Sequence, residues 1–146
     1  MSTDAAVTKE LMETLEDGKE GYAKGAERLE KDGSVAAATF RRYAEQRASF
    51  YAELQQLARG YGDQLQETGS ATAALHRGWL ALKDALAGSS PKGVLGVAES
   101  GEQHAVKEYE KALGEDISPT LKAVVERQLA EVRAAKDEIV RLHAAA

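Results

Sequence analysis

The sequence predicts an all-α protein: a four-helix bundle of two antiparallel hairpins, with one extra short helix in a long crossover between them. The first observation is composition, because the 146 residues are rich in Ala, Leu, Glu, Lys, Arg and Gln and include only two prolines. The second is that apolar residues recur at steps of three or four along several long segments. The third is that glycine and helix-capping residues stand where these segments begin and end.

Length and composition indicate a single globular domain over residues 1–146. A chain of 146 residues can bury one hydrophobic core but is too short for two, and 43% hydrophobic and 29% charged residues are ordinary values for a folded protein. The sequence contains no run of about 18 apolar residues and no basic segment followed by an apolar one. We therefore expect a cytoplasmic protein that does not bind membranes.

Charge and motif content argue against several classes of function. The formal net charge is -5, so Lys and Arg are not in excess for neutralising phosphates, and nucleic acid is not an expected partner. The chain has no cysteine, which excludes a disulfide and a thiol nucleophile. It also lacks a phosphate-binding loop, a nucleophile elbow, a Ser-His-Asp order and a zinc-protease helix. No catalytic residue is predicted.

The first hairpin is predicted from residues 4–31 and 34–61. Side-chain oxygens at Ser2-Thr3-Asp4 can cap the first helix, Gly33 ends it, and Ser34 caps the second. The second helix carries a continuous stripe at helical spacing, made by Phe40, Tyr43, Arg47, Tyr51, Leu54, Ala58 and Tyr61.

The second hairpin is predicted from residues 91–113 and 119–143. Ser90-Pro91 and Ser118-Pro119 repeat one start signal, a capping serine followed by a proline whose missing amide costs nothing at the first helical position. The crossover helix is expected at about residues 71–87. A connection of this length can run the whole length of a bundle, which favours one long crossover over short loops.

Glycines inside the first helix call for a compensating contact, because each costs up to about 1 kcal/mol relative to alanine. Gly18 and Gly25 lie on the apolar face, so we expect close approach of a neighbouring helix, with Gly101 as the counterpart. A locally weak or kinked helix is the alternative.

Five segments together resemble a known family in their order and spacing: LMETLEDGKEGYAKGAERL, AEQRASFYAELQ, ALHRGWLALKDAL, ESGEQHAVKEYEKAL and ERQLAEVRAAKDEIV. The family is a bacterial group of ferritin-like four-helix-bundle proteins, a domain of unknown function. The resemblance implies a ferritin-like fold over most of the chain and carries no activity with it.

Ferritin-like di-iron proteins bind metal through inward glutamates and Glu-x-x-His motifs, and this chain has no such motif. The positions that should hold histidine are Ala48 and Leu129. We therefore expect no cofactor. The alternative is iron or manganese at Glu102 and His104, although positions two apart on a helix diverge. The histidines of the chain are His76, His104 and His143.

Polar residues stand at the centre of the predicted core. Arg47 and Gln128 lie mid-stripe in the second and fourth bundle helices, where a buried guanidinium must be paired. We predict a buried polar layer that sets helix register, with Arg47 paired to Glu102 or Glu108 and Gln128 satisfying the remaining groups. The alternative is that Arg47 extends along the stripe with its head in water.

His76, Arg77 and Trp79 form the one aromatic and basic cluster of the crossover. Trp79 is predicted to anchor the crossover helix to the bundle, and the cluster could alternatively line a pocket for a small ligand or partner.

These observations favour a non-catalytic bundle that acts through protein contacts, as a homo-oligomer or a stress-related accessory protein whose partner the sequence does not identify. The alternatives are an atypical ferritin-like metal-binding or oxidase protein that lacks the standard ligands, and a small-molecule binder.

Overall fold

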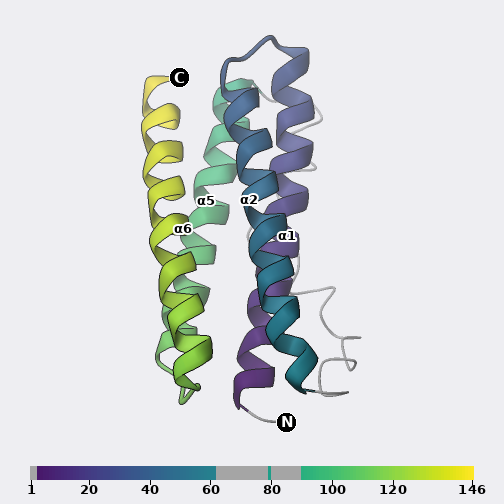
Figure 1. Ribbon diagram of the computed structural model, residues 1–146. Coiled ribbons are helices and arrows are strands. Elements are labelled where there is room, and N and C mark those ends of the chain that lie inside the picture. The colour runs from purple at the N-terminus through teal and green to yellow at the C-terminus, as the bar shows by residue number, and fades with distance from the viewer. Residues whose placement is uncertain (1–2, 62–78, 80–89) are drawn as a thin grey trace.

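The computed structural model describes residues 3–61, 79 and 90–146, and the described residues form helices and no strand. The prediction of an all-α bundle is confirmed (Figure 1). The helix expected at residues 71–87 lies outside the described residues, except for Trp79. The four helices are α1 (Thr3–Lys31), α2 (Ala36–Ala58), α5 (Pro91–Leu113) and α6 (Pro119–Ala145).

The helix ends follow local sequence signals. Gly33 adopts a left-handed φ of 66°, which lets the Ser34 amide donate to the Leu29 carbonyl at 3.0 Å and closes α1. The Ser34 hydroxyl accepts from the Ala36 amide at 3.2 Å, and α2 begins at Ala36, two residues later than predicted. This helix also ends earlier than expected, at Ala58.

Serine and proline open the second hairpin as predicted. The Ser90 hydroxyl accepts from the Gly93 amide at 3.2 Å, and the Ser118 hydroxyl accepts from the Leu121 amide at 3.3 Å. The Ser118 amide in turn donates to Asp4 at 2.8 Å, which ties the α5–α6 turn to the start of α1.

The helices pack as two hairpins. α1 packs closely along α2 and α5 along α6, α1 also contacts α5, and α2 contacts α6 more sparsely. α2 and α5 are diagonal and run in the same direction (Figure 1), which is the arrangement that a long crossover permits. Within the described residues no helix combines the length and the apolarity needed to cross a bilayer.

The apolar core falls into two clusters. One lies in the half of the bundle that holds the α1–α2 turn, and its larger members are Tyr22, Leu29, Phe40, Tyr43, Trp79, Val94, Leu95 and Ile139. The other lies toward the α5–α6 turn, and its larger members are Leu11, Leu15, Phe50, Leu54, Tyr109, Leu121, Val125, Leu129 and Val132. Polar side chains fill the level between them.

Candidate functional site

A buried ion pair joins α2 to α5 at the centre of the bundle. The two terminal nitrogens of Arg47 donate to the two carboxylate oxygens of Glu102, with Nη1–Oε1 at 2.7 Å and Nη2–Oε2 at 2.6 Å. The side chains are 2% and 0% exposed. This two-bonded geometry is the strongest that a guanidinium and a carboxylate can form. We call Arg47 and Glu102 the central pair.

Gln46 and Tyr22 make further contacts with the guanidinium of Arg47. Its Nε donates to Gln46 Oε1 at 3.1 Å, and its guanidinium carbon lies 5.5 Å from the centre of the Tyr22 ring. Burial alone lowers the pKa of Arg47, but the charge of Glu102 and its hydrogen bonds outweigh burial and raise that pKa overall. The arginine therefore keeps its charge inside the core.

Two buried tyrosines flank the central pair. Burial, followed by the charge of Glu102, raises the pKa of Tyr22 well above its ordinary value. The Tyr22 hydroxyl lies near Glu102 but meets no acceptor with hydrogen-bond geometry among the described residues. Burial likewise raises the pKa of Tyr109, whose hydroxyl donates to Gln128 Oε1 at 2.6 Å. Both phenols stay protonated at neutral pH.

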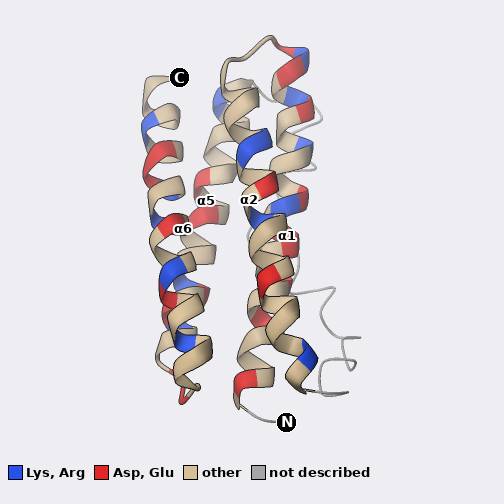
Figure 2. Ribbon diagram, viewed as in Figure 1, with Lys and Arg blue, Asp and Glu red and all other residues tan. Residues whose placement is uncertain are grey.

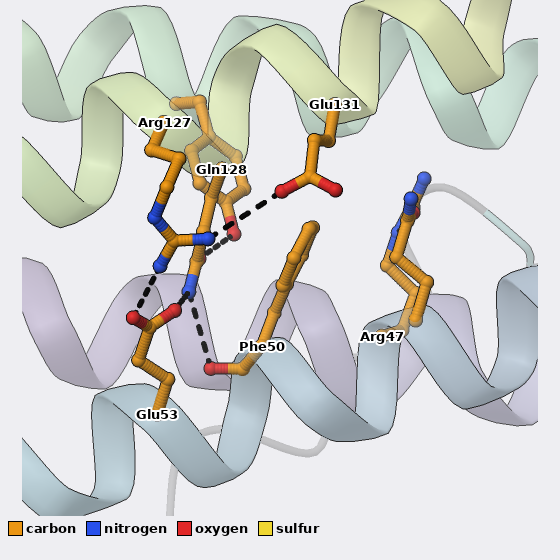
Figure 3. A network of polar contacts seen from close by, with 8 residues as sticks. Arg47, Phe50, Glu53, Arg127, Gln128 and Glu131 are labelled. Carbon is orange, nitrogen blue, oxygen red and sulfur yellow. Dashed lines mark hydrogen bonds and ion pairs between the residues drawn. The ribbon is translucent and has the colours of Figure 1, made fainter.

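Gln128 anchors a second group of polar contacts that reaches from the core to the surface (Figure 3). Its Nε2 donates to Glu53 Oε1 at 2.8 Å and to the Phe50 carbonyl at 3.4 Å. The other oxygen of Glu53 pairs with Arg127. Burial raises the pKa of Glu53, but the hydrogen bonds from Gln128 and Arg127 outweigh burial and lower it overall. We call Gln128, Tyr109, Glu53 and Arg127 the Gln128 network.

The structure brings together part of the predicted polar layer. Arg47 is paired with Glu102 in the core, so the alternative in which its guanidinium lies in water is wrong. Gln128 is buried as expected, but its side chain bonds Tyr109 and Glu53 and not the central pair (Figure 3).

Glu108 is a correction to the predicted layer. Its side chain is 19% exposed, and its Oε1 lies 3.9 Å from Nε2 of His104. At about 100° per residue, a position six residues beyond Glu102 is turned far from the core, whereas one seven residues beyond faces almost the same way. Tyr109 holds that seventh position, and this spacing was the signal that could have identified it.

Trp79 is inserted between α1 and α5. Its side chain is 6% exposed, and its ring centre lies 4.9 Å from that of Tyr22. A Cβ added at Gly21 would lie 2.3 Å from the indole, and one at Gly101 would lie 2.5 Å from it. The two glycines thus form a slot for Trp79, and the predicted close approach at Gly101 is made by an indole and not by a helix. His76 and Arg77, the other members of the predicted pocket, lie outside the described residues.

The two glycines of α1 for which a close contact was predicted, Gly18 and Gly25, differ in how closely a neighbouring side chain approaches them. A Cβ at Gly18 would meet Arg47 Nη1 at an ordinary 3.5 Å, whereas one at Gly25 would lie 2.7 Å from the Phe40 ring. Side chains of α2 therefore occupy the space above both glycines.

The donor set does not fit the metal centre of ferritin-like proteins. No group of three or more His, Asp or Glu side chains that could hold a metal occurs in the part of the chain that the structure describes. Both oxygens of Glu102 accept from Arg47, so the carboxylate of the weaker iron or manganese alternative is already paired with an organic cation. Its other member, His104, lies partly exposed near Glu108.

Comparison with known proteins identifies a family. The family model described as Domain of unknown function (DUF2383) matches residues 5–115, which include α2, α5 and all of α1 except Thr3 and Asp4. Neither a curated protein nor a solved structure matches this chain. Because the family model covers well over half of the sequence, the chain belongs to the family described as Domain of unknown function (DUF2383).

Proposed function

We propose that this chain is a non-catalytic, ferritin-like helical bundle that acts through protein contacts as a homo-oligomer. The observation that carries the proposal is the central pair. Each terminal nitrogen of Arg47 donates to one carboxylate oxygen of Glu102, at 2.6–2.7 Å. Each oxygen of this carboxylate is bonded to the same guanidinium, and the side chain is 0% exposed, so we assign it a structural role.

The described surface supports a partner of mixed charge. Lys, Arg, Asp and Glu are interspersed along the helices (Figure 2). The large hydrophobic side chains that are exposed among the described residues are Val35, at the α1–α2 turn, and Val140, on α6. Contacts made by such a surface are largely polar, and salt weakens them. The net charge of -5 supports a protein partner over nucleic acid.

The experiment is a measurement of mass in solution over a range of protein and salt concentrations. We expect a mass that is a multiple of the 15.6 kDa chain and that falls toward one chain as salt is raised. A mass of one chain under every condition would refute the homo-oligomer, and the bundle would then act with a different protein as an accessory factor.

Metal analysis of the same preparation tests the alternative of a metal-binding or oxidase protein. We expect less than one equivalent of iron and manganese in the purified protein. Stoichiometric metal that disappears in Glu102→Ala and persists in Glu108→Ala would replace the proposal with the metal-binding alternative. Glu108 is the matched control because it lies on the same helix, outside the central pair.

A further inference from the structure

Three sets of contacts along α2 connect it to the α5–α6 hairpin, and each contains a carboxylate. The first is Glu138, which accepts from Arg42 at 2.8 Å and from the Tyr43 hydroxyl. The second is the central pair, and the third is the bond of Glu53 to Arg127 and Gln128. We call the first set the Glu138 clamp.

Two of these sets lie on the edge of the bundle where packing is sparsest, and the third lies in the core beside it. α2 and α6 contact each other far less than the helices within either hairpin do. The Glu138 clamp and the Gln128 network bridge α2 to α6 directly, and the central pair reaches diagonally to α5. The α2 residues that make these contacts run from Arg42 to Glu53, so the contacts occupy the middle part of α2 and not its ends.

The opposite edge of the bundle is held differently. There α1 meets α5 and Trp79 fills the slot between Gly21 and Gly101. The contacts that hold the indole are steric and aromatic, with Tyr22 packed edge-on against it at 4.9 Å. These contacts of the indole do not depend on the charge of a carboxylate. The same side of the bundle also carries the ion pair of Lys111 with Glu10, but both side chains are more than half exposed and such pairs contribute little to stability. At the end of this edge Asp4 accepts from the Ser118 amide.

We propose that the bundle opens along the α2–α6 edge when the bridging carboxylates lose their charge, with each hairpin intact and the α1–α5 edge acting as the hinge.

The charges around each carboxylate set the direction of the pH dependence. Glu138 faces Arg42 and Tyr43 of α2. Glu102 faces Arg47 of α2 and Tyr22 of α1. Arginine does not titrate in the accessible range, and both tyrosines are neutral there, so the carboxylate is the group in each set whose charge can be removed.

Protonation favours the open form. The pKa of Glu53 is lowered in the closed bundle by Gln128 and Arg127, so the open form binds its proton more tightly and gains population as pH falls. At the central pair, replacing the carboxylate of Glu102 with a neutral amide leaves the guanidinium of Arg47 buried without a counter-charge, and opening returns it to water.

Spin-label distances test the proposal, because the chain has no cysteine and an introduced pair is therefore unique. Labels at Ser49→Cys and Ala130→Cys report on the α2–α6 edge, and labels at Glu20→Cys and Ser49→Cys report on the α1–α2 hairpin. All three positions are exposed. Emission from Trp79, the one tryptophan of the chain, reports on the hinge.

The seam variant is Glu53→Gln, Glu102→Gln and Glu138→Gln combined. At neutral pH we expect it to lengthen the Ser49–Ala130 distance while the Glu20–Ser49 distance, the helical circular dichroism and the Trp79 emission stay as in the unaltered protein. An unchanged Ser49–Ala130 distance, or simultaneous loss of all four signals, would overturn the proposal.

The matched control neutralises three carboxylates whose bonds stay within one helix or one hairpin, namely Glu16, Glu30 and Glu110. It changes the net charge equally and should leave the Ser49–Ala130 distance unchanged. Opening of this variant would also overturn the proposal.

A variant with fewer substitutions tests the proposal even if the seam variant does not fold. Glu53→Gln with Glu138→Gln leaves the central pair in place. The Ser49–Ala130 distance of this variant should lengthen at a higher pH than in the unaltered protein, ahead of any change in Trp79 emission. An unshifted transition, or one in which Trp79 emission changes first, would contradict the proposed hinge.

Discussion

Removing one member of the central pair should be far more damaging than removing both. In Glu102→Leu the guanidinium of Arg47 remains at the centre of the core, where the side chain is 2% exposed and has lost two charged hydrogen bonds. Breaking a buried pair in this way costs about 3–5 kcal/mol. That is a large part of a typical domain stability of about 5–15 kcal/mol.

The double variant Arg47→Met with Glu102→Leu replaces the pair with apolar side chains between the two existing apolar clusters. Because no charge is then desolvated, we expect its free energy of unfolding to lie within about 1–2 kcal/mol of the unaltered protein, or above it. The coupling energy between the two positions should therefore be several kcal/mol.

The assay is urea unfolding followed by far-ultraviolet circular dichroism, on both single variants and the double variant. The exposed pair Arg133 and Glu110, whose side chains are 53% and 52% exposed, is the control cycle and should show a coupling of at most about 1 kcal/mol. If Glu102→Leu costs no more than the exposed control, or if the two single costs simply add in the double variant, the guanidinium is not held in the core as described.

Two further predictions concern helix glycines and buried phenols. Gly21→Ala should displace the indole of Trp79, which would appear as a red shift of its emission. Gly18→Ala meets Arg47 only at ordinary contact distance and should raise the free energy of unfolding by up to about 1 kcal/mol. Equal effects of the two substitutions on stability and emission would contradict the slot. In an alkaline absorbance titration Tyr22 and Tyr109 should not ionise until the protein unfolds, because burial raises both pKa values. The stability they contribute is complete below the unfolded-state pKa of about 10 and is lost as pH rises above it, so ionisation of every tyrosine in the folded protein would contradict their burial.

Local sequence signals determined the helices and which side of each helix faces inward. Ser90 and Ser118 followed by proline mark helix starts that the structure reproduces, because capping depends on residues within one turn. The helical period likewise placed Arg47 and Gln128 on inward faces, and both are buried.

Only the tertiary structure decided which inward side chains meet. It selected Glu102 over Glu108 as the partner of Arg47, joined Gln128 to Tyr109 and Glu53, and placed Trp79 between Gly21 and Gly101. The period of a helix defines the direction of a side chain around its own axis. The axial offset between two helices far apart in the sequence depends on how all of their side chains pack together, and no local pattern encodes that offset.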